Sequence, residues 1–232
     1  MSEPTTPTAA AASRSKPLPP IQPWLRAVQE IINTEPWESQ PQPVQLLPWL
    51  YLSDIFTVQD LDPIRNHGAL LEHGITHVLT TSTLPTPRQV DDLRRKLASA
   101  NIQHLYCPGQ DFEGYDMIGT HWEQHCRPFL EQVRKNHYSN GNNNKSNNKV
   151  VVHCLAGMNR SALIAAAAIM VLERKRLLEV VQIIKAKRGT VLVNQSFQKQ
   201  LCLLAQQEGL LGDLPEEMGD MEKPVDFMQP TI

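Results

Sequence analysis

The chain is organised around residues 150–161, which read Val150-Val151-Val152-His153-Cys154-Leu155-Ala156-Gly157-Met158-Asn159-Arg160-Ser161. The three valines form a short apolar run that is typical of a buried strand. The alanine-rich residues 162–172 that follow are typical of a buried helix. A strand, a tight loop and a helix N-terminus form a cradle for an anion, because the backbone N–H groups of the loop converge and the helix dipole adds partial positive charge there.

Two residues suit this loop to phosphate. Gly157 can adopt a positive φ at little cost, as a tightly curled loop requires. Arg160, at the start of the helix, can bind two oxygens of a phosphate through its planar guanidinium. The residues between the cysteine and the arginine are expected to offer backbone N–H groups to the phosphate: Leu155, Ala156, Gly157, Met158 and Asn159.

Cys154 lies at the floor of the predicted cradle. Convergent N–H donors, a helix N-terminus and a guanidinium all favour its thiolate, and a thiolate that faces a bound phosphate is aligned for attack on phosphorus. Ser161 is placed to donate a hydrogen bond to the sulfur, and His153 is expected to hold the loop through its ring nitrogens. The alternative is a buried structural cysteine, which leaves the glycine, the arginine and the serine at this spacing unexplained.

The segment His-Cys-x5-Arg-Ser resembles the signature of cysteine-dependent protein tyrosine phosphatases, in particular their small, atypical dual-specificity branch. The resemblance extends over residues 44–211. It includes the Leu-Tyr-Leu-Ser-Asp run at 50–54, where Ser53 stands in place of the usual glycine, and the Asn-x-x-Phe-x-x-Gln-Leu run at 194–201. It implies a single-domain α/β fold, with a central, mostly parallel sheet flanked by helices and the site at the carboxyl end of the cradle strand.

The resemblance also implies a mechanism. Cys154 would attack a phosphoester, a cysteinyl-phosphate would form, and water would hydrolyse it while Arg160 holds the phosphoryl oxygens. A general acid must protonate the leaving oxygen, and the family's aspartate matches Asp111. Glu113 is a less favoured candidate for this acid. Asp116 is the expected N-cap of the next helix. Asn194 would support the cradle, cap the last helix, or do both.

The implied substrate is a phosphoprotein that carries phosphotyrosine and also phosphoserine or phosphothreonine. Residues 155–159 are uncharged, which argues against the polyanionic head group of a lipid. A first alternative is an RNA 5′-triphosphatase, whose Gly-x-Asn-Arg segment resembles residues 157–160. A second is a pseudophosphatase that binds phosphoproteins without hydrolysing them, although Cys154, Arg160 and Asp111 are all present.

Composition argues against several classes of binding partner and cellular location. A net charge of −2 gives no indication that the protein binds nucleic acid or a membrane surface. No apolar run reaches the ~18 residues of a helix that spans a membrane. The four cysteines have no paired or metal-like spacing, so we expect a reducing compartment, the cytoplasm or also the nucleus, and neither a metal nor a cofactor. A glycan at Asn159 would block the cradle, which also favours an intracellular protein. The sequence specifies no oligomeric state.

The chain is expected to have three parts. Residues 1–43 are a disordered leader rich in Pro, Ala and Thr, with a short amphipathic helix at 23–33 that docks on the domain or binds a partner. Residues 44–211 are the catalytic domain, interrupted by an Asn-rich loop insertion at 140–148. Residues 212–232, with six acidic residues and one lysine, are a flexible acidic tail.

Local patterns predict the remaining elements of the domain. Strands are expected at 44–47, 49–52, 74–79 and 102–107. Helices are expected at 60–67, 88–100, 116–137, 177–187 and 195–209.

Overall fold

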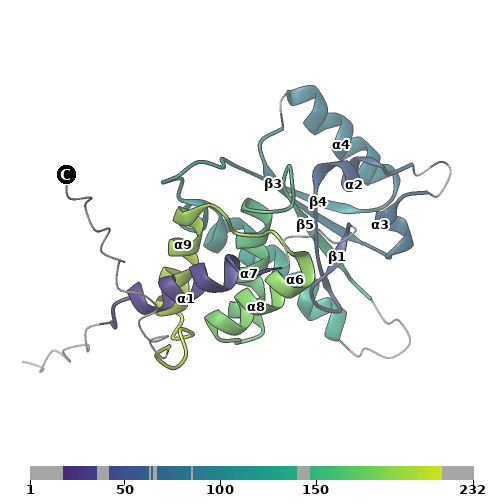
Figure 1. Cartoon of the computed structure of the whole chain (residues 1–232). Helices are drawn as coiled ribbons and strands as arrows, with labels where there is room; N and C mark the ends of the chain where they lie inside the picture. The colour runs from purple at the N-terminus through teal and green to yellow at the C-terminus, as the bar shows by residue number, and fades with distance from the viewer. Residues whose placement is uncertain are drawn as a thin grey trace, which may run out of the picture.

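A computed structural model describes residues 18–35, 42–62, 64, 67–84, 86–139 and 147–215. Within these residues the centre of the fold is a five-stranded sheet in the order β1-β2-β5-β3-β4 (Figure 1). The strands are β1 (Val44–Gln45), β2 (Leu50–Ser53), β3 (His77–Ser82), β4 (Gln103–Gly109) and β5 (Val150–His153). β1 pairs antiparallel with β2, and the other neighbouring strands pair parallel. The mostly parallel sheet predicted from the sequence is confirmed.

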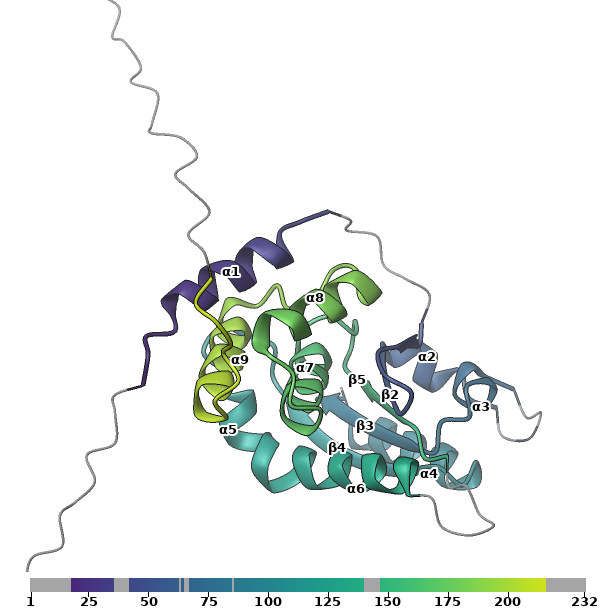
Figure 2. The ribbon, with the colours of Figure 1, turned by 90° about the horizontal axis from the view of Figure 1, so that it is seen from below.

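Helices cover both faces of the sheet (Figures 1 and 2). One face carries α2 (Ile55–Gln59), α3 (Ala69–Glu72) and α4 (Pro87–Ser99). The other carries α1 (Gln22–Ile32), α5 (Met117–His121), the π-helical turn η1 (Trp122–Cys126), α6 (Arg127–Tyr138), α7 (Arg160–Leu172), α8 (Leu177–Arg188) and α9 (Gln195–Gln207).

β5 explains why the valine run is continuous. The strand lies between β2 and β3 in the sheet, and helices cover both of its faces. Val150 and Val152 pack into the cluster around α7, whereas Val151 packs into the cluster formed with α2, α3 and α4. Because successive side chains of a strand point to opposite faces, only an uninterrupted apolar run fills both clusters. α7 is itself buried along almost its whole length, and its alanines allow close packing.

α1 docks on the domain. Trp24, Val28 and Ile32 are buried in the cluster that contains α8 and α9, and Gln206 Nε2 donates to Pro19 O over 2.5 Å. The helix begins one residue before the predicted range and ends one residue before its end. Docking removes the apolar side chains of this helix face from water, as is usual for an apolar helix face.

Three predictions about elements were wrong in detail. The strand expected at 74–79 is β3, which starts three residues later, at His77. The helix expected at 60–67 is replaced by α2, and Asp62 instead pairs with His67 in an isolated antiparallel bridge. The helix starts early because Asp54 caps it by accepting from Thr57 N over 2.8 Å. The single helix expected at 116–137 is divided by the π-helical turn η1, which ends just before Pro128, a residue with no N–H to donate.

Several predicted segments fall outside the described residues. These are residues 1–17 and 36–41 of the leader, 140–146 of the Asn-rich insertion and 216–232 of the acidic tail. Among the described residues, no helix has the length and apolar content needed to cross a membrane.

Candidate active site

The cradle is the loop between β5 and α7. Cys154 follows the last residue of β5 and is 1 % exposed, and Arg160 begins α7. Ser161 is fully buried and its Oγ donates to Cys154 Sγ over 3.2 Å. A hydroxyl donor at this distance stabilises negative charge on the sulfur. The structure therefore brings together the cysteine, the serine and the arginine that the sequence singled out.

The carbonyl groups of the loop are turned away from its centre. Those of Leu155, Ala156 and Met158 each accept a hydrogen bond from a neighbouring segment. The donors are Ile55 N to Leu155 O at 3.2 Å, Arg188 Nη2 to Ala156 O at 3.1 Å, and Leu192 N to Met158 O at 2.8 Å. With these oxygens held on the outside, the loop can present its N–H groups inward, which is the arrangement that binds anions.

Gly157 is required by the shape of this loop. Its φ is +68°, and a Cβ built on it would lie 2.8 Å from Ser53 O, a backbone atom of β2. Such a contact is too short for a real Cβ, so any other residue must push the loop away from the sheet.

We expect Gly157→Ala to lower the free energy of unfolding by about 2 kcal/mol, because the substitution adds backbone strain and a short contact with Ser53. Phosphate affinity should fall as well, because the loop must shift. Gly209→Ala is the matched control, since Gly209 has a φ of +67° but no atom within 4 Å of an added Cβ. Urea unfolding and calorimetric titration with inorganic phosphate measure both effects. Equal results for the two variants would contradict this account of Gly157.

Asp111 lies against the cradle. Asn194 Nδ2 donates to its Oδ1 over 3.2 Å, and Asn159 Nδ2 donates to its Oδ2 over 3.3 Å. Arg160 Nε lies 3.6 Å from the same Oδ2, and Arg160 Nη1 donates to Gly109 O over 3.2 Å. The side chain of Asp111 is 27 % exposed, whereas that of Arg160 is only 11 % exposed. A carboxyl group is thus held at the mouth of the cradle, beside the guanidinium.

The two other carboxylates of this loop cap helices. Glu113 accepts from Gln195 N and Ser196 N, both over 2.9 Å, at the start of α9. Asp116 caps α5 by accepting from Gly119 N over 2.8 Å, as predicted. Carboxylates at these places satisfy free N–H groups and interact favourably with the helix dipole. Because Glu113 and Asp116 are engaged as helix caps, Asp111 is the one of the three carboxylates that faces the cradle.

Gln200, the glutamine of the Asn-x-x-Phe-x-x-Gln-Leu run, holds the same loop from the other side, a role that the sequence did not indicate. Its Oε1 accepts from Met117 N and Ile118 N over 2.9 and 3.0 Å, and its Nε2 donates to Tyr115 O over 2.7 Å. Glu113 therefore caps α9 while a residue of α9 caps α5. This reciprocal capping fixes the backbone on both sides of the loop that carries Asp111.

Asn194 links the loop to the cradle. Besides binding Asp111, it caps α9 through its Oδ1, which accepts from Ser196 N and Phe197 N. Its backbone N–H donates to Asn159 Oδ1 over 3.2 Å. The supporting and capping roles considered for this residue are therefore compatible within one geometry.

His153 supports the loop from beneath. Its Nδ1 lies 3.3 Å from Cys154 O, so we assign the N–H there, and Nε2 then accepts from Thr80 Oγ1 over 2.7 Å. Complete burial lowers the pKa of His153 to about 4, so the ring is neutral near pH 7. Thr81 Oγ1 donates to His153 O over 2.8 Å and fixes the end of β5.

Arg188, at the end of α8, is a second guanidinium near the sulfur that the sequence reasoning missed. It is 3 % exposed and donates to Ala156 O, while its Nε and Nη1 have no hydrogen-bond partner among the described residues. Burial lowers the pKa of Arg188, and the charges of Asp54 and Cys154 oppose that shift. An arginine retains its proton in spite of such burial, so it adds positive charge behind the cradle.

Comparisons with known proteins point to one family. The family model for the dual specificity phosphatase catalytic domain matches residues 65–207. Human dual specificity protein phosphatase 2 is 29 % identical over 185 residues, which are 80 % of this chain and 50 % of that protein. Bovine dual specificity protein phosphatase 26 is 29 % identical over 163 residues, 69 % of this chain and 65 % of that protein. The chain spans about half the length of the first of these relatives.

Solved structures support the fold. The crystal structure of DUSP15 superimposes with a TM-score of 0.52 at 25 % identity and covers 72 % of this chain and 94 % of that one. Human DUSP28 gives a TM-score of 0.54 at 20 % identity, with 72 % and 95 % covered. The family match includes the cradle, the loop of Asp111 and the whole of α9. This chain therefore belongs to the dual specificity phosphatases.

Proposed function

We propose that the protein is a cysteine-dependent protein phosphatase that hydrolyses phosphotyrosine together with phosphoserine or phosphothreonine. The observation that carries the proposal is one loop in which Ser161 bonds Cys154 while Arg160 lies beside Asp111. Ser161 Oγ donates to Cys154 Sγ over 3.2 Å, and Arg160 Nε lies 3.6 Å from Asp111 Oδ2. Family membership supports the same activity.

The first step would transfer the phosphoryl group to the enzyme. Cys154 Sγ attacks phosphorus, the bond from phosphorus to the leaving oxygen breaks, and Asp111 gives its proton to that oxygen. Arg160 and the loop N–H groups hold the three phosphoryl oxygens, whose charge is spread in the transition state.

The second step would release phosphate. The Asp111 carboxylate takes a proton from water, the water oxygen attacks phosphorus, and the P–S bond breaks. Sulfur leaves as a thiolate, and the hydrogen bond from Ser161 stabilises it. Neither step calls for a metal or a cofactor.

Asp111→Asn tests the acid directly. We expect kcat/KM near neutral pH to fall by ~10²–10³-fold on phenyl phosphate, because an amide cannot protonate the leaving oxygen in the first step. The loss should be smaller on para-nitrophenyl phosphate, whose leaving group is stable without a proton. Asp116→Asn is the matched control, since asparagine also caps a helix. Equal losses on the two substrates would refute the acid assignment.

The surroundings of the cradle favour a phosphopeptide substrate. Three large apolar side chains are exposed there: Phe56, Phe112 and Leu155, at 72 %, 56 % and 55 %. Phe112 follows Asp111, and the segment of Phe56 lies beside Leu155 because Ile55 N donates to Leu155 O. We call these three side chains the apolar rim. Exposed apolar groups around a site commonly mark a binding surface.

Phosphopeptides with matched sequences test the substrate assignment. We expect comparable kcat/KM on phosphotyrosine and phosphothreonine peptides, and about tenfold higher values when apolar rather than acidic residues flank the phosphoresidue, the effect of burying about one side chain. Phe56→Ala should reduce that preference, whereas Leu203→Ala, which changes a partly exposed leucine of α9, should not. A strict preference for phosphotyrosine would rule out dual specificity.

Two other functions predict different results in these assays. An RNA 5′-triphosphatase, suggested by the Gly-Met-Asn-Arg segment at 157–160, would release phosphate from triphosphate-ended RNA faster than from phosphopeptides. A pseudophosphatase would bind phosphopeptides and release no phosphate.

All four cysteines are free and buried, which supports our inference of a reducing compartment, the cytoplasm or the nucleus.

A further inference from the structure

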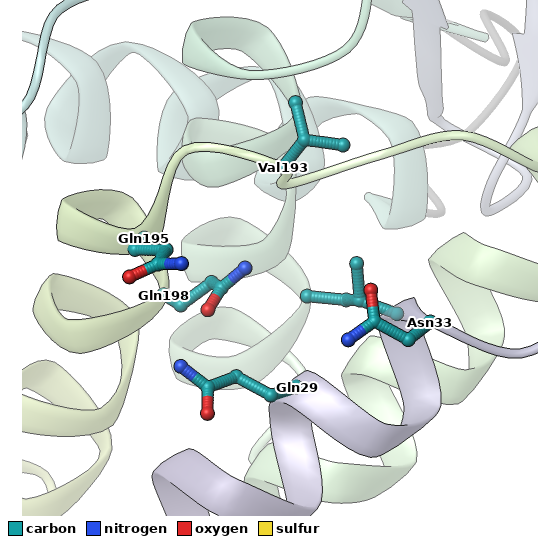
Figure 3. A pocket seen from close by; sticks show the side chains of 6 residues that line it. Gln29, Asn33, Val193, Gln195 and Gln198 are labelled. Carbon is teal, nitrogen blue, oxygen red and sulfur yellow. The ribbon is translucent and has the colours of Figure 1, made fainter.

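A separate pocket lies between α1 and the segment that leads into α9. Its volume is about 230 Å³. Figure 3 shows Gln29 of α1 and Asn33, which follows this helix, on one side, opposite Gln195 and Gln198 of α9, with Val193 on the connecting segment. Its six lining residues are Gln29, Ile32, Asn33, Val193, Gln195 and Gln198. Four of the six are carboxamides and none is charged.

Gln198 supplies an unused acceptor inside this pocket. The residue is 4 % exposed, and its Nε2 donates to Leu192 O over 2.7 Å, which fixes the orientation of the carboxamide. Oε1 therefore points away from Leu192, toward the side of the pocket where Gln29 lies (Figure 3). This oxygen is buried and has no hydrogen-bond partner among the described residues. Buried acceptors of this kind are rare, and a ligand N–H would satisfy it.

The lining defines the chemistry of such a ligand. Carboxamides each offer both a donor and an acceptor, so they pair best with another group that has both. The uncharged lining gives a carboxylate or a phosphate no partner of opposite charge, and Ile32 and Val193 add apolar surface. The volume is below the ~300–1,000 Å³ of most drug-sized sites. We propose that the pocket binds a small, uncharged molecule with a primary carboxamide on an apolar ring, of which benzamide is the simplest.

The position of the pocket connects it to the cradle. Val193 and Gln195 flank Asn194, whose side chain holds Asp111. α1 lies outside the residues matched by the family model, so three of the six lining residues come from a segment that this match does not include. Binding here does not depend on the phosphatase proposal, because none of the lining residues belongs to the cradle.

NMR titration of the ¹⁵N-labelled full chain with benzamide tests the proposal, with benzoate as the charged control of the same shape. We expect saturable shifts of the side-chain amides of Gln29 and Gln195, with a Kd of about 1–10 mM for a ligand of roughly nine non-hydrogen atoms. Benzoate should cause no saturable shift at these amides.

Two variants locate the binding. Gln29→Ala, on the half-buried face of α1, should weaken benzamide binding by about tenfold, which is one lost hydrogen bond. Gln132→Ala, an exposed glutamine of α6, should leave the affinity unchanged. Shifts that do not saturate, equal binding of benzoate, or insensitivity to Gln29→Ala would each overturn the proposal. The thermal stability of each variant, measured without benzamide, identifies any loss that is due to unfolding.

Discussion

Cys154→Ser is expected to lower kcat on aryl phosphates by at least ~10⁴-fold, because a serine hydroxyl at this place stays protonated and has no base to activate it. His153, the nearest imidazole, cannot act as that base, since its ring nitrogens are engaged with Cys154 O and Thr80. The substitution replaces sulfur by oxygen in a buried position and leaves the cradle itself intact. The variant should therefore still bind phosphopeptides.

Cys202 offers the matched control. It is also fully buried, and burial raises its pKa to about 12, so it remains a thiol at neutral pH. Cys202→Ala should keep the wild-type kcat, measured well below its melting temperature. Substantial turnover by Cys154→Ser, or a comparable loss in Cys202→Ala, would mean that Cys154 is not the nucleophile.

Arg160→Lys should have the second largest effect, a fall of ~10³-fold in kcat/KM. An ammonium group is a single point of charge and cannot bridge two phosphoryl oxygens. It also cannot keep the bond to Gly109 O while it lies beside Asp111, as the guanidinium does. The variant keeps the positive charge, so the loss of kcat/KM reports the contribution of the geometry of the guanidinium.

The inhibition constant of inorganic phosphate separates binding from catalysis in this variant. We expect it to rise together with KM, whereas Arg174→Lys, which changes an exposed arginine paired with Glu208, should alter neither constant. If Arg160→Lys retained the wild-type kcat/KM, simple charge would suffice and the bidentate role would be wrong.

The cradle could be predicted from the sequence because it is local. A valine run, a glycine at a positive φ, and an arginine at the first turn of a helix lie within residues 150–161, and each fixes its own conformation. The helix expected at 60–67 was wrong, because that prediction did not take account of a helix cap that is visible in the sequence. Asp54 accepts from Thr57 N, and α2 begins at Ile55, five residues before the predicted start.

The support of the cradle could not be predicted in the same way. Gln200 reaches Met117 across 83 residues, and Glu113 reaches Gln195 across 82. No periodicity or spacing encodes such contacts, because they depend on how α9 packs against the loop that carries Asp111. Arg188 ends a helix with basic residues in its last turn, which normally indicates a solvated terminus. Only the packed fold turns its side chain inward to Ala156.

The cysteinyl-phosphate is the central claim, and trapping it is the most direct test. Ser161→Ala removes the donor to Cys154 Sγ, so the sulfur becomes a poorer leaving group and the second step should slow more than the first. Rapid acid quenching of this variant during turnover of para-nitrophenyl phosphate, followed by intact-mass and peptide analysis, should reveal one added phosphoryl group on Cys154. Turnover without any adduct, or an adduct on another residue, would contradict the account.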